Sequence, residues 1–410
     1  MTTRSTEVLV VGAGPAGAAA ATWSARAGRE VLLIDAQDFP RDKTCGDGLT
    51  PRAIAQLQLL GMDAWLADRP RNHGIRMMGF GARHELQWNG PNLPSFGSAA
   101  PRWELDDAIR SVAVDAGAHF LGSTKAIGAE RANDGRVTAV NVAGAHGLER
   151  IECTHLIVAD GVRSGLGRSL GRIWHRNTVY GIAARAYIQS GLHEDPWITS
   201  HLELRDEEQR ALPGYGWIFP LGDGRVNIGV GSLATDHRNS NVNLHRLLHD
   251  YASMQRKPWQ LQGELSSLAS AMLPMGGAVS SVAGSNWMLI GDAAACVNPL
   301  NGEGIDYGLE TGRHAAMLLG ESDLERAWPA LLQHAYGDTF SIARRLGVLL
   351  TLDWFLPTFG PFGMRSASIM EIALRVMGNL VTEDDQDVTA RLWRAAGAVS
   401  SRLDERRPWA

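Results

Sequence analysis

The sequence EVLVVGAGPAGAAAATWSARAGREVLLID runs from Glu7 to Asp35. An apolar, β-rich segment is followed by three glycines spaced G-x-G-x-x-G, an alanine-rich helix and a second apolar segment that ends at Asp35. A lone glycine motif is weak evidence, but this one joins a strand to a helix, as a dinucleotide-binding fold requires. The stretch therefore predicts a Rossmann-like unit that binds a dinucleotide.

Each glycine of the motif is expected to have its own role. Gly12 allows a tight turn, Gly14 lets a pyrophosphate approach the backbone, and Gly17 lets the helix lie close to the strand. The helix N-terminus then faces the phosphates with its partial positive charge. Asp35 is expected to bond the ribose hydroxyls. The motif alone does not distinguish FAD from NAD.

A second half-site lies far along the chain. An apolar strand at 287–290 leads to Asp292, and a glycine-rich loop at 301–304 precedes a helix that extends to about residue 319. An aspartate beyond a strand can bond a ribityl hydroxyl of FAD. N–H groups at the start of the helix can face the flavin edge where negative charge collects. Two half-sites separated by an insertion predict one FAD-binding domain.

Composition narrows the class of protein. The 410 residues carry 39 Lys and Arg against 44 Asp and Glu, and this net charge of −5 argues against a nucleic-acid partner. Cys45, Cys153 and Cys296 are too few and too scattered for a disulfide framework or a zinc site. The 13 histidines show no metal spacing, so no metal is expected. Neither a secretory signal nor a transmembrane span is predicted.

Two C-terminal stretches are strongly apolar. The stretch Leu346–Met364 is interrupted by Asp353, Pro357 and Pro361. It favours a buried helix end, and the alternative is a segment that dips into one leaflet of a bilayer. Residues 366–380 repeat apolar side chains at helical spacing, which fits either packing on the core or a membrane contact.

Between the half-sites, residues 214–219 and 225–230 flank a glycine-rich turn and predict a β-hairpin. Tyr215, Trp217 and Phe219 alternate along its first strand and should point to one face. They would form an aromatic wall that suits a polyisoprene chain, because this stretch has no arginine or lysine for a polar substrate. The alternative is a sheet face packed on its own helices.

Together these elements resemble the geranylgeranyl reductase family of FAD-dependent oxidoreductases, which has the p-hydroxybenzoate hydroxylase type of fold. The residues that carry the resemblance are Gly12–Gly17, Lys43–Gly48, Arg102, Pro213–Pro220, Asn227–Gly229 and Gly291–Ile305. We expect an α/β chain of three parts. These are a Rossmann-like FAD-binding domain (1–75, 101–175 and 280–335), an α+β substrate domain with an antiparallel sheet (76–100 and 176–279), and a C-terminal helical region (336–410).

The half-sites and the resemblance together imply a cofactor-binding set. Its members are Gly12, Gly14, Ala16, Gly17, Asp35, Cys45, Gly46, Gly48, Arg102, Ala126, Asp160, Asp292, Gly302, Gly304 and Ile305. The family pattern places Cys45 beside the isoalloxazine ring, and the expected catalytic residues are Cys45, Tyr215 and Trp217. The alternatives are a packed apolar thiol for Cys45, an ordinary turn at Asp160 and a solvated side chain for Arg102.

Within this family, the chain is most similar to reductases of the menaquinone side chain. The similarity implies a polyprenyl quinone substrate in which one isoprene double bond is saturated, in the second unit from the ring. Reduced FAD would give a hydride to one alkene carbon and an acid would protonate the other. The acid could be Cys45, Tyr215 or a held water, and the sequence does not decide among them. The electron donor is expected to be NAD(P)H or a small redox carrier. Because the quinone resides in the membrane, we expect peripheral attachment at the cytoplasmic side of the cell membrane.

Three other functions fit parts of the pattern. A reductase of another polyprenyl lipid, of geranylgeranyl type, would share the motifs. FAD-dependent monooxygenases and halogenases share the nucleotide elements, but halogenases carry Trp-x-Trp-x-Ile-Pro where this chain has Tyr-Gly-Trp-Ile-Phe-Pro. Non-catalytic prenyl-lipid carriers lack an intact flavin set, whereas this chain keeps both halves.

Overall fold

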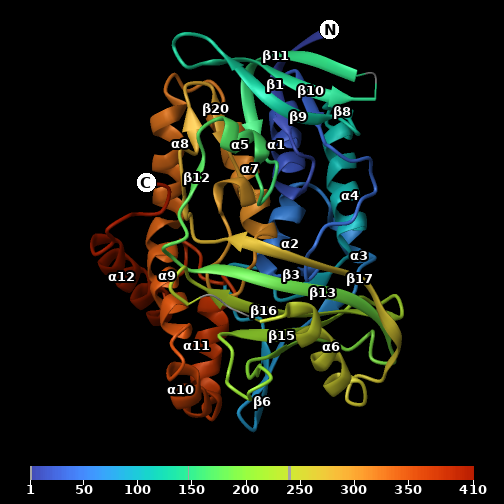
Figure 1. Ribbon diagram of the computed structural model, residues 1–410, viewed down its shortest axis with the longest axis vertical. Helices are drawn as coiled ribbons and strands as arrows, with labels where there is room; N and C mark the ends of the chain where they lie inside the picture. Colours follow the sequence, from blue (N-terminus) through green and yellow to red (C-terminus); the bar gives the residue numbers. More distant parts are fainter. Residues whose placement is uncertain (1, 146, 239–241) are drawn as a thin grey trace.

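The computed structural model describes residues 2–145, 147–238 and 242–410. A mostly parallel sheet lies at one end of the molecule, a second sheet lies at the other, and the C-terminal helices run along one side (Figure 1). Residues 1, 146 and 239–241, which fall inside the expected domain ranges, lie outside the described part of the chain.

Within the described residues, the first sheet has eight strands. In order across the sheet, six of them are β19 (Ala283–Gly284), β20 (Trp287–Leu289), β11 (Gly147–Val158), β1 (Thr2–Val11), β2 (Val31–Ile34) and β8 (His119–Leu121). β10 (Val137–Gly144) pairs with β11 and with β9 (Lys125–Arg131). The pairs of β1 with β11 and β2 are parallel, as the glycine motif predicts.

β1 begins earlier than its apolar sequence indicates. The sequence predicts a strand from Glu7, but the structure extends it back to Thr2. The added residues pair in register with β11, from Thr2 opposite Glu149 to Thr6 opposite Cys153. The extension therefore depends on pairing with a strand far along the chain, and the local sequence of residues 2–6 does not indicate this pairing.

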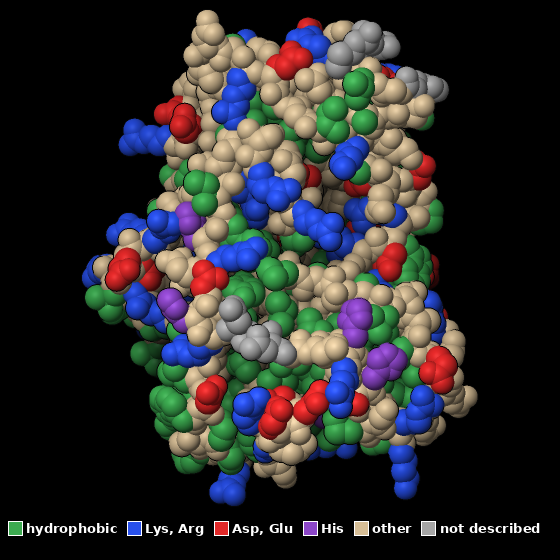
Figure 2. Space-filling model, viewed as in Figure 1, with side chains coloured by type: hydrophobic (Ala, Val, Ile, Leu, Met, Phe, Trp, Pro, Cys, Tyr) green, Lys and Arg blue, Asp and Glu red, His purple; other side chains and the backbone are tan. Residues whose placement is uncertain are grey.

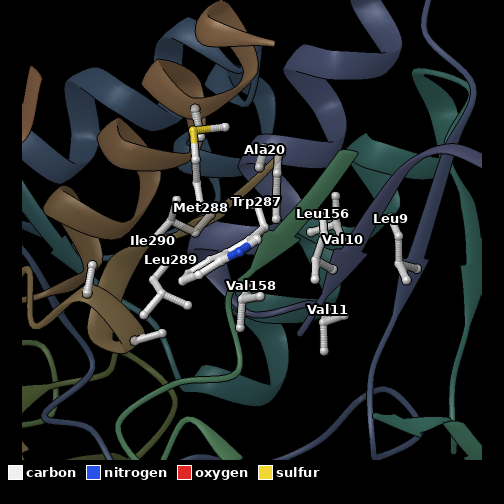
Figure 3. Packing of buried hydrophobic residues seen from close by; sticks show 14 of the residues in the cluster. Leu9, Val10, Val11, Ala20, Leu156, Val158, Trp287, Met288, Leu289 and Ile290 are labelled. Atoms are coloured by element: carbon white, nitrogen blue, oxygen red, sulfur yellow. The ribbon is translucent and has the colours of Figure 1, made fainter. Parts of the chain in front are cut away.

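The core of the first sheet consists of continuous apolar runs from neighbouring strands (Figure 3). Leu9, Val10, Leu156 and Met288 are fully buried. This is the pattern of parallel strands that are covered on both faces. The helices around this sheet are α1 (Pro15–Arg26), α4 (Arg102–Asp115), α7 (Ile305–Leu318) and α8 (Leu324–Leu332).

α7 packs directly on α1 through a glycine. A Cβ on Gly312 would stand 2.4 Å from the carbonyl oxygen of Ala16 and 2.9 Å from the backbone nitrogen of Ala20. Gly308, one turn earlier, lies over Ala16 as well. The first turns of the two helices are therefore held side by side.

The second sheet has seven strands in the described part of the chain. In order they are β17 (Leu261–Pro274), β13 (Tyr180–Ser190), β16 (Arg225–Ala234), β15 (Gly214–Pro220), β14 (Trp197–His201), β5 (Gly74–Gly79) and β6 (Ala82–Gln87). β15 and β16 pair antiparallel, which confirms the predicted hairpin. α6 (Leu244–Gln255) packs on this sheet through Leu248 and Tyr251.

Shorter elements lie in the segments between these strands and helices. They are β3 (Gly48–Leu49), β7 (Gly97–Ala99), β4 (Arg71–Asn72), β12 (Ile173–Trp174), β18 (Val279–Ser280), α2 (Pro51–Leu59), α3 (Asp63–Ala67), α5 (Gly165–Ser169) and the 3-10 helix η1 (Gly291–Ala294). The chain ends in the π-helical turn η2 (Gln333–Gly337), α9 (Asp338–Leu350), α10 (Phe355–Met364), α11 (Ala367–Met377) and α12 (Val388–Arg402). None of the helices that the structure describes is long and apolar enough to cross a membrane.

α10 is not the buried helix end that the sequence favours. Trp354 is 56% exposed, Phe359 49% and Phe362 69%. The two prolines lie within this separate helix, after a turn at 351–354, so the segment leaves the core instead of continuing α9. Apolar side chains gather at the lower left of the face in Figure 2, where Figure 1 places α10 and α11. α11 buries Met370 and exposes Ile372.

Gly312→Ala should destabilise the protein by about 1–3 kcal/mol, because the new methyl group would force α7 away from α1. Urea unfolding of the purified protein measures the change in the free energy of unfolding. Gly128→Ala on β9 is the matched control, since its Cβ would meet no atom within 4 Å, and it should change stability by less than about 0.5 kcal/mol. Equal stabilities of the two variants would contradict the packing argument.

Candidate active site

The three glycines of the first motif have the expected geometry. Gly12 has φ +101°, and its Cβ would stand 2.3 Å from the carbonyl oxygen of Ala159. A Cβ on Gly17 would stand 1.8 Å from the carbonyl oxygen of Gly12. Gly14 instead faces only the ends of the Arg41 and Arg102 side chains, at 3.5 and 3.8 Å, and the Asp106 carboxylate at 3.8 Å. The backbone in front of α1 is therefore open where a pyrophosphate would approach.

Two arginines and two carboxylates lie beside this opening. Asp35 accepts a hydrogen bond from the Ala13 N–H at 2.8 Å and lies 3.6 Å from the Arg41 guanidinium. Arg41 and Arg102 both bind the fully buried carboxylate of Asp106, at 2.9 and 2.6 Å. Arg102 is 5% exposed and is the first residue of α4, so the solvated alternative is wrong.

The second half-site brings three chain segments together. Asp292 in η1 accepts from Lys43 Nζ at 3.0 Å. Its other carboxylate oxygen lies 3.1 Å from where a Cβ of Gly304 would be. Gly304 is the residue before α7, and Ile305 is the first residue of that helix. The positive end of α7 is thus placed next to Asp292 and the Lys43 loop.

The remaining predicted positions lie at the edges of these half-sites. Asp160 follows β11, accepts from the Leu166 N–H at 2.9 Å, and has a pKa that burial raises. Ala126 lies on β9 opposite Val142, partly buried against the first core. Gly302 has φ +76° in the loop before α7.

The loop from Cys45 to Gly48 faces the second sheet. Cys45 is half-buried, and burial raises the pKa of its thiol. A Cβ on Gly46 would stand 3.3 Å from Trp217 Nε1, and one on Gly48 would stand 3.0 Å from Phe219. The loop and the aromatic side chains of β15 are therefore in direct contact.

Tyr215, Trp217 and Phe219 form one row, as predicted. Successive ring centroids are 5.9 and 6.3 Å apart. Trp217 covers Gly229 on the neighbouring strand, where a Cβ would stand 2.1 Å from its ring. Tyr215 donates its hydroxyl hydrogen to the carbonyl oxygen of Asn301, and burial raises the pKa of the phenol.

Sequence reasoning missed a buried network beneath this row. Asn227 accepts from Trp217 Nε1 at 2.9 Å and donates to both the Cys45 carbonyl oxygen and the Asp47 carboxylate at 2.9 Å. Tyr187 donates to the same oxygen of Asp47 at 2.6 Å. Asp47 and Asn227 stand inside the blocks that carry the family resemblance, but nothing in the sequence indicates that they meet.

A second set of contacts links the C-terminal helices to the loop before α7. Asn301 Nδ2 donates to the carbonyl oxygen of Met377 at 2.6 Å, and Asn379 Nδ2 donates to Asp306 at 2.6 Å. Burial raises the pKa of Asp306 to about 6. The segment that follows α11 is therefore bonded to the first turn of α7.

Comparison with known proteins agrees with this geometry. The FAD binding domain family matches residues 5–224. The chain is 59% identical over 405 residues to the menaquinone reductase of Mycobacterium tuberculosis, covering 99% of this chain and 98% of that one. It is 60% identical over 412 residues to the menaquinone reductase of Mycolicibacterium smegmatis, covering all of both. This chain belongs to the geranylgeranyl reductase family of FAD-dependent oxidoreductases.

A solved structure shows the same fold for this flavoprotein. The geranylgeranyl bacteriochlorophyll reductase-like protein of Thermoplasma acidophilum superposes with a TM-score of 0.77, covering 92% of this chain and 99% of that one. At 21% identity this likeness shows the fold alone. The predicted p-hydroxybenzoate hydroxylase type of fold, with its FAD-binding part, second sheet and C-terminal helices, is confirmed.

The cofactor of this oxidoreductase is FAD. The open backbone at Gly14 and the converging first turns of α1 and α7 suit an anionic dinucleotide. In the described part of the chain, no group of three His, Cys, Asp or Glu side chains is placed to hold a metal ion.

Gly14→Val should weaken FAD binding at least about tenfold, because the side chain would project into the opening in front of α1. The flavin absorbance of the purified protein and a fluorescence titration with FAD measure the loss. Gly128→Val is the control of equal size on an open strand position, and it should keep full FAD content. Normal FAD affinity in Gly14→Val would place the pyrophosphate elsewhere.

Proposed function

We propose that this flavoprotein saturates one isoprene double bond of the menaquinone side chain, in the second unit from the ring. The observation that carries the proposal is the row of Tyr215, Trp217 and Phe219, which faces the Cys45–Gly48 loop. β15 offers aromatic surface and no arginine or lysine, which suits a polyisoprene chain. The two relatives at 59 and 60% identity, both called menaquinone reductase, support a menaquinone-type substrate.

The proposed FAD contacts are the fifteen positions of the expected cofactor-binding set, which the structure distributes over the two half-sites, the Cys45 loop and their edges. When bound and reduced, FAD supplies a hydride. The chain's own part is to orient the alkene against the Cys45 loop and to exclude water. The double bond is not conjugated to a carbonyl group, so positive charge develops on the alkene as it is protonated. The aromatic rings of Tyr215 and Trp217 would stabilise that charge.

The proposal also covers the electron donor and an alternative substrate. The electron donor is NAD(P)H or a small redox carrier. The main alternative substrate is another polyprenyl lipid of geranylgeranyl type. The aromatic row would contact the isoprenoid tail and not the head group, so it would accept the tail of either lipid.

Mass spectrometry of quinones from cells with and without the gene tests the function. The gene should add two hydrogens to the menaquinone tail, and fragmentation should place them in the second isoprene unit. Cys45→Ala and Cys45→Ser, both with FAD bound, should lower this conversion if Cys45 is catalytic. An unchanged quinone alongside a more saturated phospholipid chain would favour the alternative substrate. Air-dependent hydroxylation of the product would favour a monooxygenase.

We also propose that the protein attaches peripherally to the cytoplasmic side of the cell membrane through α10 and α11. Phe359, Phe362, Ile369 and Ile372 on these neighbouring helices are all more than a third exposed, and so is Trp354 in the turn before α10. Aromatic and branched apolar side chains of this kind insert at the boundary between lipid head groups and acyl chains. A membrane contact here would place the enzyme next to the bilayer in which the quinone is dissolved.

Phe359→Asp combined with Phe362→Asp should reduce binding to phospholipid vesicles at least about tenfold, because charged side chains resist entry into the bilayer. Vesicle flotation measures the bound fraction. Val388→Asp with Leu392→Asp on α12 is the matched control, since these exposed apolar residues lie on a different helix. Equal loss in both pairs, or no binding by the wild type, would contradict attachment through α10 and α11.

A further inference from the structure

The 3-10 helix η1 lies against the two helices whose first turns converge at the cofactor site. A Cβ on Gly291, the first residue of η1, would stand 2.8 Å from the Ala16 Cβ on α1 and 3.7 Å from the Gly308 Cα on α7. Asp292, the second residue, accepts from Lys43 Nζ at 3.0 Å. The position of η1 therefore decides where the Asp292 carboxylate lies.

Two buried side chains from distant parts of the chain donate to successive carbonyl oxygens of η1. Arg172 Nε donates to Ala293 at 2.6 Å, and Trp409 Nε1 donates to Ala294 at 2.7 Å. Arg172 is 6% exposed and Trp409 is 3% exposed. The donors lie 121 and 115 positions away from the residues that they bind. Both carbonyl groups belong to the residues that directly follow Asp292.

We propose that Arg172 and Trp409 are positioning residues of the cofactor site. By holding two carbonyl groups of η1, they keep the Asp292 carboxylate at the place from which it is proposed to bond FAD. The inference rests on that proposed contact, and neither Arg172 nor Trp409 belongs to the proposed set of FAD contacts.

Trp409 is itself fixed by its surroundings. Its backbone N–H donates to the Gly277 carbonyl oxygen at 2.9 Å, and a Cβ on Gly277 would stand 2.7 Å from its ring. Its backbone has φ +60°, in the left-handed region, and such a conformation persists where the surrounding structure holds it. The indole N–H group is therefore held in place against Ala294.

The aromatic neighbours of Trp409 extend to the first turn of α7. Its ring centroid lies 5.5 Å from that of Phe340 and 6.4 Å from that of Tyr336. These two rings lie 5.1 and 5.3 Å from Tyr307, the third residue of α7. Trp409 thus bonds η1 directly and packs on the rings that support α7, the other part of the second half-site.

Arg172 differs from Trp409 because it donates from a charged group. Burial lowers the pKa of Arg172 to about 10, and the charges of Asp160 and Asp292 oppose this shift, so the guanidinium stays protonated at neutral pH. Hydrogen bonds from a charged donor are stronger than those from a neutral one. We therefore expect the bond to Ala293 to be the stronger of the two.

Trp409→Phe keeps an aromatic ring and removes the N–H group. It should weaken FAD binding at least about tenfold, because the Ala294 carbonyl oxygen loses its buried donor and η1 shifts. Fluorescence titration of the apoprotein with FAD measures the change. Trp88→Phe is the matched control, since Trp88 is also buried and donates to Asn72 at 2.8 Å, and it should leave the FAD affinity unchanged.

Two substitutions of Arg172 separate the hydrogen bond from the rest of the side chain. Glutamine can place its amide nitrogen where Arg172 has Nε, whereas methionine has a similar length and no donor. Arg172→Met should weaken FAD binding at least about tenfold, and Arg172→Gln should stay within about threefold of the wild type. Equal FAD affinities of these two variants would overturn the role of the bond to Ala293.

A double-mutant cycle with Asp292→Ala distinguishes positioning from a general loss of stability. Without the carboxylate there is nothing for η1 to place, so adding Trp409→Phe should weaken FAD binding less than about twofold further. A tenfold loss in both backgrounds would overturn the proposal, and so would normal FAD affinity in Trp409→Phe.

If Trp409→Phe does not yield folded protein, the comparison of Arg172→Met with Arg172→Gln decides. Normal FAD affinity in Asp292→Ala alone would remove the contact on which the inference rests and would overturn it as well. These titrations contain no menaquinone. Failure of the wild type to reduce menaquinone would therefore contradict the proposed function and leave the test of Arg172 and Trp409 unaffected.

Discussion

A side chain at Gly17 would place its Cβ 1.8 Å from the carbonyl oxygen of Gly12, so only glycine lets α1 lie this close to the end of β1. That approach fixes where α1 begins. α7 then packs on α1 through Gly312, which places the first turns of both helices side by side. Two partial positive charges converge there, and an anionic dinucleotide is the ligand that this arrangement favours.

The second constraint is a buried side chain that joins the second sheet to the Cys45–Gly48 loop. Asn227 on β16 bonds the Trp217 ring, the Cys45 backbone and the Asp47 carboxyl group at once. Without Asn227, the Trp217 N–H and the Cys45 carbonyl oxygen would each lose this partner, at a cost of about 1–3 kcal/mol apiece, whereas the Asp47 oxygen would keep its bond from Tyr187. The aromatic row and the cysteine loop are therefore held in one arrangement, which suits a substrate that offers few polar contacts.

The sequence predicts those features that local spacing determines. The turn at Gly12, the hairpin of β15 and β16, and the common face of Tyr215 and Trp217 follow from periods of two and from glycine spacing. Features that depend on contacts between residues far apart in the chain cannot be predicted from local spacing. The early start of β1 needs β11, and the meeting of Asp47 with Asn227 joins residues 180 positions apart. The exposure of α10 depends on the turn that separates it from α9, and its composition alone indicates burial.

The hydrogen bonds of Asn301 with Met377 and of Asn379 with Asp306 tie the C-terminal end of α11 to the first turn of α7 and the loop before it. With the bilayer contact proposed for α10 and α11, the height of the cofactor above the lipid surface becomes a fixed length. A tail drawn from the bilayer must cross that length before any double bond reaches the flavin. Under the proposed function, the isoprene unit to be reduced would be selected by its distance from the lipid surface, with no recognition of that unit by its chemistry.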